Sequence, residues 1–297
     1  YSFVKAGSRY NSRKEKPRVA FLTTLFPVPV DYIRDFLRSL SNQTYKLFDL
    51  ILMNDGYGDF HGLKEEFASV NIIEIASKGT IAKNREELIK YSLHNGYDIA
   101  IFGDIDDYFS ENRVQLSVEN LVIADIVVNE LSPFSEVEKP SRRIITNRLS
   151  GFASSPLTFI LDKNIFGLSN TAVNLRKVDA SILEFPDDII AVDWYFYSIL
   201  LLSGLSAVFT EDTTTFYRQH IGNIVGASDF SAESLRKAVK VRLGHYAYMS
   251  KIDQRYKILY EQELGLCRVL EDEAKLKKIV SKNQRELNSP LWWEVTL

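Results

Sequence analysis

Cysteine is almost absent from this sequence, and its scarcity excludes two ways of stabilising a protein. Cys267 is the only cysteine among 297 residues, so this sequence can form neither an internal disulfide nor a zinc site built from several cysteines. Proteins without disulfides are typical of reducing compartments. With 45% hydrophobic residues the chain can bury a sizeable core, and we expect a cytoplasmic globular protein.

Long apolar runs and an excess of basic charge are also lacking. The longest uncharged stretch near the middle, Trp194–Phe209, is shorter than the ~20 apolar residues of a membrane span, and we expect a buried helix and a strand there. The polar, basic run 5–18 lacks the apolar core of a signal peptide. A net charge of −3 provides no general field that would attract nucleic acid, so we expect no nucleic-acid partner.

Predicted strands and helices alternate along the first part of the chain. Four apolar segments are expected to form buried strands, with amphipathic helices between them, the first capped by Asp31 and a later one covering about 81–94. This alternation predicts an α/β fold with a mostly parallel central sheet flanked by helices. The predicted strands are 18–24, 48–53, 71–75 and 98–103.

The second part of the chain has a less regular pattern. A strand is predicted at Ile123–Val128 and a buried helix at Val192–Leu202. From Ala232 onward, charged residues interleave with apolar ones in a helical pattern, which predicts a C-terminal helical appendage. The predicted organisation is a polar N-terminal extension at 1–17, a main domain at 18–228 and a helical region at 229–297.

Carboxylates cluster directly after the fourth predicted strand, at Asp104, Asp106 and Asp107. Several carboxylates held close together are unfavourable without a compensating cation. Mg²⁺ and Mn²⁺ prefer oxygen ligands, commonly one or two carboxylates together with substrate phosphate oxygens. The cluster therefore suggests a divalent metal site, with an acidic turn or helix cap as the structural alternative.

Two further loops carry side chains suited to a nucleotide. In parallel sheets, ligands bind beyond the carboxyl ends of the strands, where Thr23–Phe26, Asp55 and Asp104 are all expected. The turn around Asp55 is acidic and has His61 where a dinucleotide fingerprint requires glycine, so Asp55 suits a base or ribose better than pyrophosphate. The alternative for this segment is a simple turn.

Basic residues surround the predicted start of a helix near residue 81. Lys78, Lys83 and Arg85 lie where free N–H groups of a helix and basic side chains can both face an anion. A contact with a diphosphate is therefore expected, and a solvated surface is the alternative for any one of them.

Two later segments carry candidate catalytic and metal-binding groups. Asp193 lies at the start of an apolar helix, a favourable position for any carboxylate, and it could serve as a general base for a substrate hydroxyl. Residues 217–223 combine Arg218 and His220 in a loop bounded by glycine. A lone histidine is usually a surface residue, but here we expect His220 to bind a metal or phosphate together with Asp106.

The order of these motifs resembles the family 2 glycosyltransferases over roughly Val19–Gly226. In that family a helix ends in Ser-x-Gln-Thr-Tyr, here residues 41–45, and the next strand ends in an Asp-Gly turn, here residues 55–56. Residues 104–106 match the family's Asp-x-Asp motif. Residues 217–226 are similar to the Tyr-Arg-Gln-His-x-x-Asn-x-x-Gly of bacterial rhamnosyl and related surface-polysaccharide transferases.

The resemblance implies the GT-A nucleotide-diphospho-sugar transferase fold and a hexosyltransferase activity. The enzyme would move a sugar from a nucleotide-diphospho-sugar to an acceptor hydroxyl with inversion, in bacterial surface-polysaccharide or glycan biosynthesis. UDP- and dTDP-sugars are the favoured donors, a glycan or lipid-linked molecule is the expected acceptor, and Mn²⁺ or Mg²⁺ is the expected cofactor. The C-terminal helices would contact a second copy of the chain or the inner face of the membrane.

The resemblance also implies roles for individual residues. Asp193, which matches the family's base motif, would deprotonate the acceptor, while Asp106 and His220 would hold the metal. The implied donor-binding residues are Thr23, Phe26, Asp55, Tyr57, Lys83, Arg85, Asp104, Ile105 and Arg218.

Three departures from the family pattern keep alternatives open. Residues 23–27 replace Pro-x-Tyr-Asn, Tyr57 replaces a serine, and Val192 replaces the acidic residue before the base. One alternative is a non-catalytic sugar- or partner-binding descendant of the fold, since fold alone does not establish activity. A metal-dependent sugar nucleotidyltransferase would carry a Gly-rich basic loop after the first strand, and a glycosidase would not require the nucleotide-like loops.

Overall fold

An eight-stranded mixed sheet forms the centre of the protein. The computed structural model describes residues 16–136, 139–140, 143–149, 156–219, 231–286, 291 and 293–294. The strands are β1 (Val19–Leu25), β2 (Phe48–Asn54), β3 (Asn71–Ala76), β4 (Ile99–Phe102), β5 (Tyr108–Phe109), β6 (Ile126–Phe134), β7 (Thr171–Asn174) and β8 (Ala207–Arg218). Their order in the sheet is β3-β2-β1-β4-β7-β6-β8-β5.

The strand directions explain why one edge of the sheet collects the loops of interest. Strands β3, β2, β1 and β4 pair in parallel, and β6 pairs in parallel with β8. Strand β7 is antiparallel to both of its neighbours, and β5 is antiparallel to β8. The predicted mostly parallel sheet is therefore confirmed, and its parallel strands end at a common edge.

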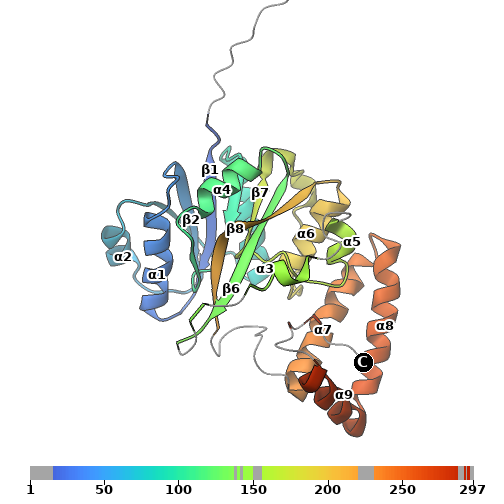
Figure 1. Ribbon diagram of the computed structural model, residues 1–297. Helices are drawn as coiled ribbons and strands as arrows, with labels where there is room; N and C mark the ends of the chain where they lie inside the picture. The colour runs from blue at the N-terminus through green and yellow to red at the C-terminus, as the bar shows by residue number, and fades with distance from the viewer. Residues whose placement is uncertain are drawn as a thin grey trace, which may run out of the picture.

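Helices cover both faces of this sheet, as predicted. In Figure 1, the first two helices lie on one side of the sheet and the fifth and sixth lie on the other, while the last three extend away from it. The helices are α1 (Val30–Ser41), α2 (His61–Glu66), α3 (Ile81–His94), α4 (Arg113–Asn120), α5 (Pro156–Ile160), α6 (Val192–Leu202), α7 (Ala232–Met249), α8 (Gln254–Leu270) and α9 (Glu273–Glu286). Short 3₁₀ turns lie at Thr146–Arg148, Leu175–Lys177 and Ala180–Ile182.

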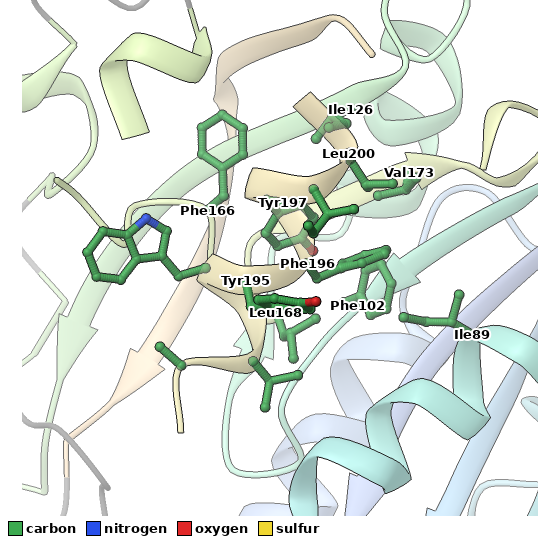
Figure 2. Close-up of a cluster of buried hydrophobic side chains, with 14 of the residues drawn as sticks. Ile89, Phe102, Ile126, Phe166, Leu168, Val173, Tyr195, Phe196, Tyr197 and Leu200 are labelled. Carbon is green, nitrogen blue, oxygen red and sulfur yellow. The ribbon is translucent and has the colours of Figure 1, made fainter. Parts of the chain in front are cut away.

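Alternation of side chains along the strands divides the core between the two faces, because successive strand residues point to opposite sides. Phe21 of β1 faces α1, where its ring centroid lies 5.9 Å from that of Phe36. On the other face, Phe102 of β4 packs against Phe196 of α6, with ring centroids 6.1 Å apart (Figure 2). Helix α6 is buried nearly all round, as its uniformly apolar sequence predicted.

Two local predictions differ from the structure. Pro29, not Asp31, occupies the N-cap position of α1, and Asp31 lies in the first helical turn. Proline is tolerated at this position because the N–H that it lacks would have no partner within the helix. The strand predicted at Ile123–Val128 begins only at Ile126, because the preceding residues form the turn that follows α4, and it continues to Phe134.

The predicted C-terminal helical appendage is present. Helices α7, α8 and α9 share a small apolar core of their own. Helix α7 also packs on α6, where the rings of His245 and Trp194 stack at 3.9 Å between centroids. The boundary predicted at residue 228 and most of the predicted extension 1–17 lie outside the described residues. Within the described parts of the chain, none of the helices combines the length and apolar character needed to cross a membrane.

Gly103, which follows β4, offers a test of packing beneath the carboxyl edge. A β-carbon at this position would lie 2.5 Å from Cζ of Phe109 and 2.6 Å from Cε1 of Phe21, so both rings would have to shift. We expect Gly103→Ala to lower the free energy of unfolding by about 1–3 kcal/mol, as overpacking of a dense core usually does. Urea denaturation followed by fluorescence would measure the change.

Gly58→Ala is the matched control, because a β-carbon at Gly58 meets no atom within 4 Å. Its unfolding free energy should stay within about 0.5 kcal/mol of wild type, as for most surface substitutions. Equal stability of the two variants would contradict the packing argument.

Candidate active site

The acidic loop, residues 103–107, connects β4 to β5 at the carboxyl edge of the sheet. The N–H of Gly103 donates to the carbonyl oxygen of Leu22 at 3.1 Å, which extends the pairing of β1 and β4 up to this loop. The N–H of Asp55 donates to the carbonyl oxygen of Leu25 at 2.7 Å. The loops after β1, β2 and β4 therefore lie side by side, and Asp55 and Asp104 share one edge as the strand pattern predicted.

Asp104 and Asp107 of the acidic loop have different partners. Asp104 forms an ion pair with Nη2 of Arg85 at 2.5 Å. Asp107 is fully buried, and its carboxylate accepts hydrogen bonds from the Ser169 hydroxyl and, at 2.9 Å, from the N–H of Arg218. The side chain of Asp107 therefore connects the loop to Ser169 and Arg218, whereas Asp104 is paired with the guanidinium of Arg85.

Burial and mutual repulsion concentrate unfavourable negative charge in this loop. Burial raises the pKa of Asp107 well above its usual range, and the charges of Asp106 and Asp104 raise it further. Burial also raises the pKa of Asp104, where the neighbouring Arg85 acts in the opposite direction. Arg85 therefore offsets only part of the charge that the loop carries.

A divalent cation fits this donor set. Mg²⁺ and Mn²⁺ are commonly held by one or two carboxylates and completed by phosphate oxygens of the substrate. Within the part of the chain that the structure describes, no three His, Cys, Asp or Glu side chains are arranged to hold a metal ion by themselves. Asp106 stays the predicted protein ligand of such a site, which phosphate oxygens would have to complete. The predicted second ligand, His220, lies outside the described residues.

Asp193 lies in the first turn of α6, and two donors hold its carboxylate. Its Oδ1 accepts the N–H of Trp194 at 2.8 Å and Nδ2 of Asn164 at 3.0 Å. Burial raises the pKa of Asp193 to about 6, and the charge of Asp104 adds to this effect, while the two hydrogen bonds oppose it. A carboxylate that titrates near neutral pH and stays ionised at pH 7 suits a general base.

The loop at 164–170, which precedes β7, joins Asp193 to the acidic loop. Asn164 binds Asp193 at one end, and Ser169 binds Asp107 and accepts the N–H of Asp104 at the other. The sequence analysis gave no role to these side chains. The available signal was the polar pair Ser169-Asn170 directly before a buried strand, where unpaired polar groups are costly.

Asn170 stabilises this loop through side-chain hydrogen bonds to the backbone. Its Nδ2 donates to the carbonyl oxygen of Asn129 at 3.1 Å, and its Oδ1 accepts the N–H of Gly167 at 2.8 Å. Thr215 adds a hydrogen bond from its hydroxyl to the carbonyl oxygen of Ser169 at 2.8 Å. The separation between Asp193 and the acidic loop is therefore set by a loop whose own backbone is hydrogen-bonded to the sheet.

Two of the three basic residues predicted to contact a diphosphate, Lys83 and Arg85, differ in their surroundings. Arg85 reaches the site through Asp104, and its buried Nη1 finds no hydrogen-bond partner among the described residues. Lys83 instead binds Glu86 at 2.9 Å and the carbonyl oxygen of Phe185 at 2.8 Å, so it holds the segment that leads to α6. The structure brings Arg85 into the site and gives Lys83 partners within the fold.

The remaining candidate donor-binding residues lie at the same edge with different exposure. Thr23, two residues before the end of β1, is buried, and its hydroxyl finds no partner among the described residues. Phe26 and Tyr57 are partly buried against the core beneath α1. Ile105 is fully buried, and its side chain packs into this same core. Arg218, at the end of β8, is also buried and binds the acidic loop.

Comparison with a curated protein supports the resemblance. No protein-family model matches the chain. The dTDP-rhamnosyl transferase RfbG of Shigella flexneri is 24% identical over 168 residues, which cover 54% of this chain and 56% of that protein. The match thus spans about half the length of that relative.

Solved structures with a similar fold include two nucleotide-sugar complexes. S. aureus TarS 1–349 in complex with UDP-GlcNAc has a TM-score of 0.58 at 14% identity, covering 91% of this chain and 92% of that one. Mannosyltransferase PcManGT of Pyrobaculum calidifontis, in complex with GDP-Man and Mn²⁺, has a TM-score of 0.57 at 11% identity, covering 93% and 77%. The chain therefore has the fold of these glycosyltransferases, the GT-A fold that its motifs predicted.

The raised pKa of Asp193 predicts that this carboxylate destabilises the fold at neutral pH. The carboxyl binds its proton more tightly in the folded chain than in the unfolded chain, so stability is lost as the pH rises through about 6. We expect Asp193→Asn to unfold with a free energy higher by on the order of 2 kcal/mol at about pH 8, and with no difference near about pH 4. Urea denaturation across this range would measure it.

Asp187→Asn is the control for this prediction, because the side chain of Asp187 is exposed in the segment before α6. Its stability should follow the wild-type curve at every pH. A constant difference between Asp193→Asn and wild type across the pH range would contradict the burial argument.

Proposed function

We propose that this chain is a glycosyltransferase that moves a hexosyl group from a nucleotide-diphospho-sugar to an acceptor hydroxyl with inversion. The observation that carries the proposal is the partly buried carboxylate of Asp193, held by the 164–170 loop across from the acidic loop at the carboxyl edge of the sheet. The likeness in fold to TarS and PcManGT adds support, because both were solved with nucleotide sugars.

In this mechanism Asp193 acts as the general base. Its carboxylate accepts the proton of the acceptor hydroxyl while the hydroxyl oxygen forms a bond to the anomeric carbon and the bond to the nucleoside diphosphate breaks. The attack and the departure occur on opposite faces of the sugar, which inverts the anomeric centre. The raised pKa of Asp193 favours proton acceptance, and Asn164 and Trp194 keep the carboxylate in one orientation.

The acidic loop would bind and orient the donor. Asp104 and Asp55 would hold the nucleoside, with Arg85 beside Asp104 facing the diphosphate. A divalent cation held by Asp106 and His220 would offset the charge that develops on the departing diphosphate. Mn²⁺ is the first ion to test, because PcManGT was solved with it.

The donor and acceptor classes follow from the resemblance and the comparisons. UDP- and dTDP-sugars are the favoured donors, as the UDP-GlcNAc complex of TarS and the name of the rhamnosyl transferase suggest. The acceptor would be a glycan or a lipid-linked molecule in bacterial surface-polysaccharide biosynthesis. We place the reaction in the cytoplasm or at the inner face of the membrane, with helices α7–α9 contacting the membrane or a second copy.

Nucleotide binding tests the donor site directly. Calorimetric titration of UDP, dTDP and GDP, with and without Mn²⁺, should reveal one nucleotide whose affinity depends on the metal. Asp106→Ala should weaken this binding by about tenfold or more, since it removes a proposed metal ligand. Asp212→Ala, at an exposed position of β8, should leave it unchanged. Failure of all three nucleotides to bind would favour a non-catalytic descendant of the fold.

Transfer assays test the proposed base. With the donor class identified by binding, release of nucleoside diphosphate in the presence of glycan acceptors should fall at least about 100-fold in Asp193→Asn, because general base catalysis contributes that much. Nucleotide affinity should remain unchanged. In wild type, kcat/KM should fall as the pH drops below about 6, where Asp193 becomes protonated.

Asn164→Ala should move this acid limb to higher pH, since it removes a hydrogen bond that lowers the pKa of Asp193. Full transfer activity in Asp193→Asn would rule out the proposed base. Release of pyrophosphate instead of nucleoside diphosphate would identify a nucleotidyltransferase.

A further inference from the structure

Glu86 of α3 carries a buried carboxylate that binds a distant segment of the chain. Only 5% of its side chain is exposed. Its Oε2 accepts the N–H of Phe185 at 2.7 Å and lies 2.9 Å from Nζ of Lys83, while Oε1 lies 2.5 Å from Nζ of Lys90. Nζ of Lys83 also donates to the carbonyl oxygen of Phe185 at 2.8 Å. Helix α3 therefore binds both polar groups of the main chain of Phe185.

The two lysines keep the carboxylate of Glu86 charged. Burial by itself would raise the pKa of Glu86, but hydrogen bonds from Lys90, from the N–H of Phe185 and from Lys83 lower it below its usual value. The carboxylate is therefore ionised at neutral pH, and an ionised acceptor forms a stronger hydrogen bond to an N–H than a neutral one does. Removal of this charge would weaken the contact with Phe185 and deprive the two lysines of the anion that they share.

The side chain of Phe185 packs on the first turns of α6. Its ring centroid lies 5.9 Å from that of Tyr195 and 5.6 Å from that of Phe196. Both of these residues lie within one helical turn of Asp193. The main chain of Phe185 is thus held by α3 and its ring by α6, so this one residue connects the two helices.

The residue before Glu86 connects α3 to the acidic loop. Arg85 forms the ion pair with Asp104 at 2.5 Å. Neighbouring residues of α3 therefore hold the two halves of the candidate site, Arg85 the acidic loop and Glu86 the segment before α6. Phe102, directly before the acidic loop, packs on Phe196 with ring centroids 6.1 Å apart (Figure 2). Helix α3, strand β4 and helix α6 are thus joined by contacts on each side.

We infer that Glu86 and Lys83 are positioning residues, which set the place of Asp193 relative to the acidic loop by holding the main chain of Phe185. This inference rests on the proposed function, and it gives Lys83 a different role from the diphosphate contact that its place in the sequence suggested. The sequence analysis gave no role to Glu86. A displacement of about 1 Å in a reacting group can lower a rate about 100-fold, even when the mutated residue lies away from the chemistry.

Glu86→Gln tests the inference, with Glu87→Gln as the matched control at the next position of α3. Glu87 is partly buried and forms no hydrogen bond or ion pair with any residue that the structure describes. With the donor and acceptor that support transfer in wild type, Glu86→Gln should lower kcat about tenfold or more, because the base is no longer held in place. Its affinity for the nucleotide, measured by calorimetry, should equal that of wild type. Glu87→Gln should match wild type in both measurements.

Two lysine variants and one normalisation separate positioning from a loss of folding. Each kcat is divided by the fraction of protein that binds nucleotide, taken from the calorimetric stoichiometry, so a variant that only unfolds more easily keeps the wild-type kcat. Lys83→Met removes a hydrogen bond to Phe185, whereas Lys90→Met removes only an ion pair with Glu86. Lys83→Met should therefore lower kcat more than Lys90→Met does, and this comparison tests the inference even if Glu86→Gln fails to fold.

A wild-type kcat in Glu86→Gln, or equal kcat in Lys83→Met and Lys90→Met, would overturn the inference. Weaker nucleotide binding in Lys83→Met would also overturn it, because that result identifies Lys83 as a donor contact. If wild type transfers no sugar, or if Asp193→Asn keeps full activity, the proposed function fails and the inference fails with it. Loss of transfer in Asp193→Asn together with an unaffected Glu86→Gln overturns the inference alone.

Discussion

Repulsion among carboxylates at the carboxyl edge of the sheet is the constraint on which the site depends. Each carboxylate is stabilised in a different way: Asp104 by an ion pair with Arg85, Asp107 by neutral donors, and Asp193 by Asn164 and its own helix. Neutral hydrogen bonds leave much of the burial cost in place, which is why the pKa values of Asp107 and Asp193 stay raised. The acidic loop and Asp193 therefore lower the stability of the fold at the positions where the proposed function places a cation and a proton.

The supports of these carboxylates come from segments far apart in the chain. Arg85 lies on α3, Ser169 and Asn164 on the loop before β7, and Arg218 at the end of β8. They meet because β4 lies at the centre of the sheet between parallel β1 and antiparallel β7. Antiparallel β7 begins at the edge where β4 ends, so the loop that precedes it reaches the acidic loop directly.

The C-terminal helices are connected to the site through α6. His245 of α7 stacks on Trp194, the residue after Asp193, and Nε1 of that indole donates to the carbonyl oxygen of Ile160 at 2.7 Å. The first turn of α6 is therefore packed between α5 and α7. The appendage therefore packs directly against the helix turn that carries Asp193.

The sequence by itself determined the first four strands, the helices α1, α3 and α6, and the acidic loop, because these depend on local patterns. The amphipathic pattern predicted α3 (Ile81–His94), the uniformly apolar run predicted α6 (Val192–Leu202), and the aspartates at 104–107 are close together in the chain. Tertiary structure alone decided the partners of those aspartates. Asp35 and Arg218, which form a salt bridge, are 183 positions apart, and no local sequence pattern predicts that pair. The same is true of the hydrogen bond from Lys83 to the carbonyl oxygen of Phe185. Such contacts depend on strand order and loop direction, which periodicity does not encode.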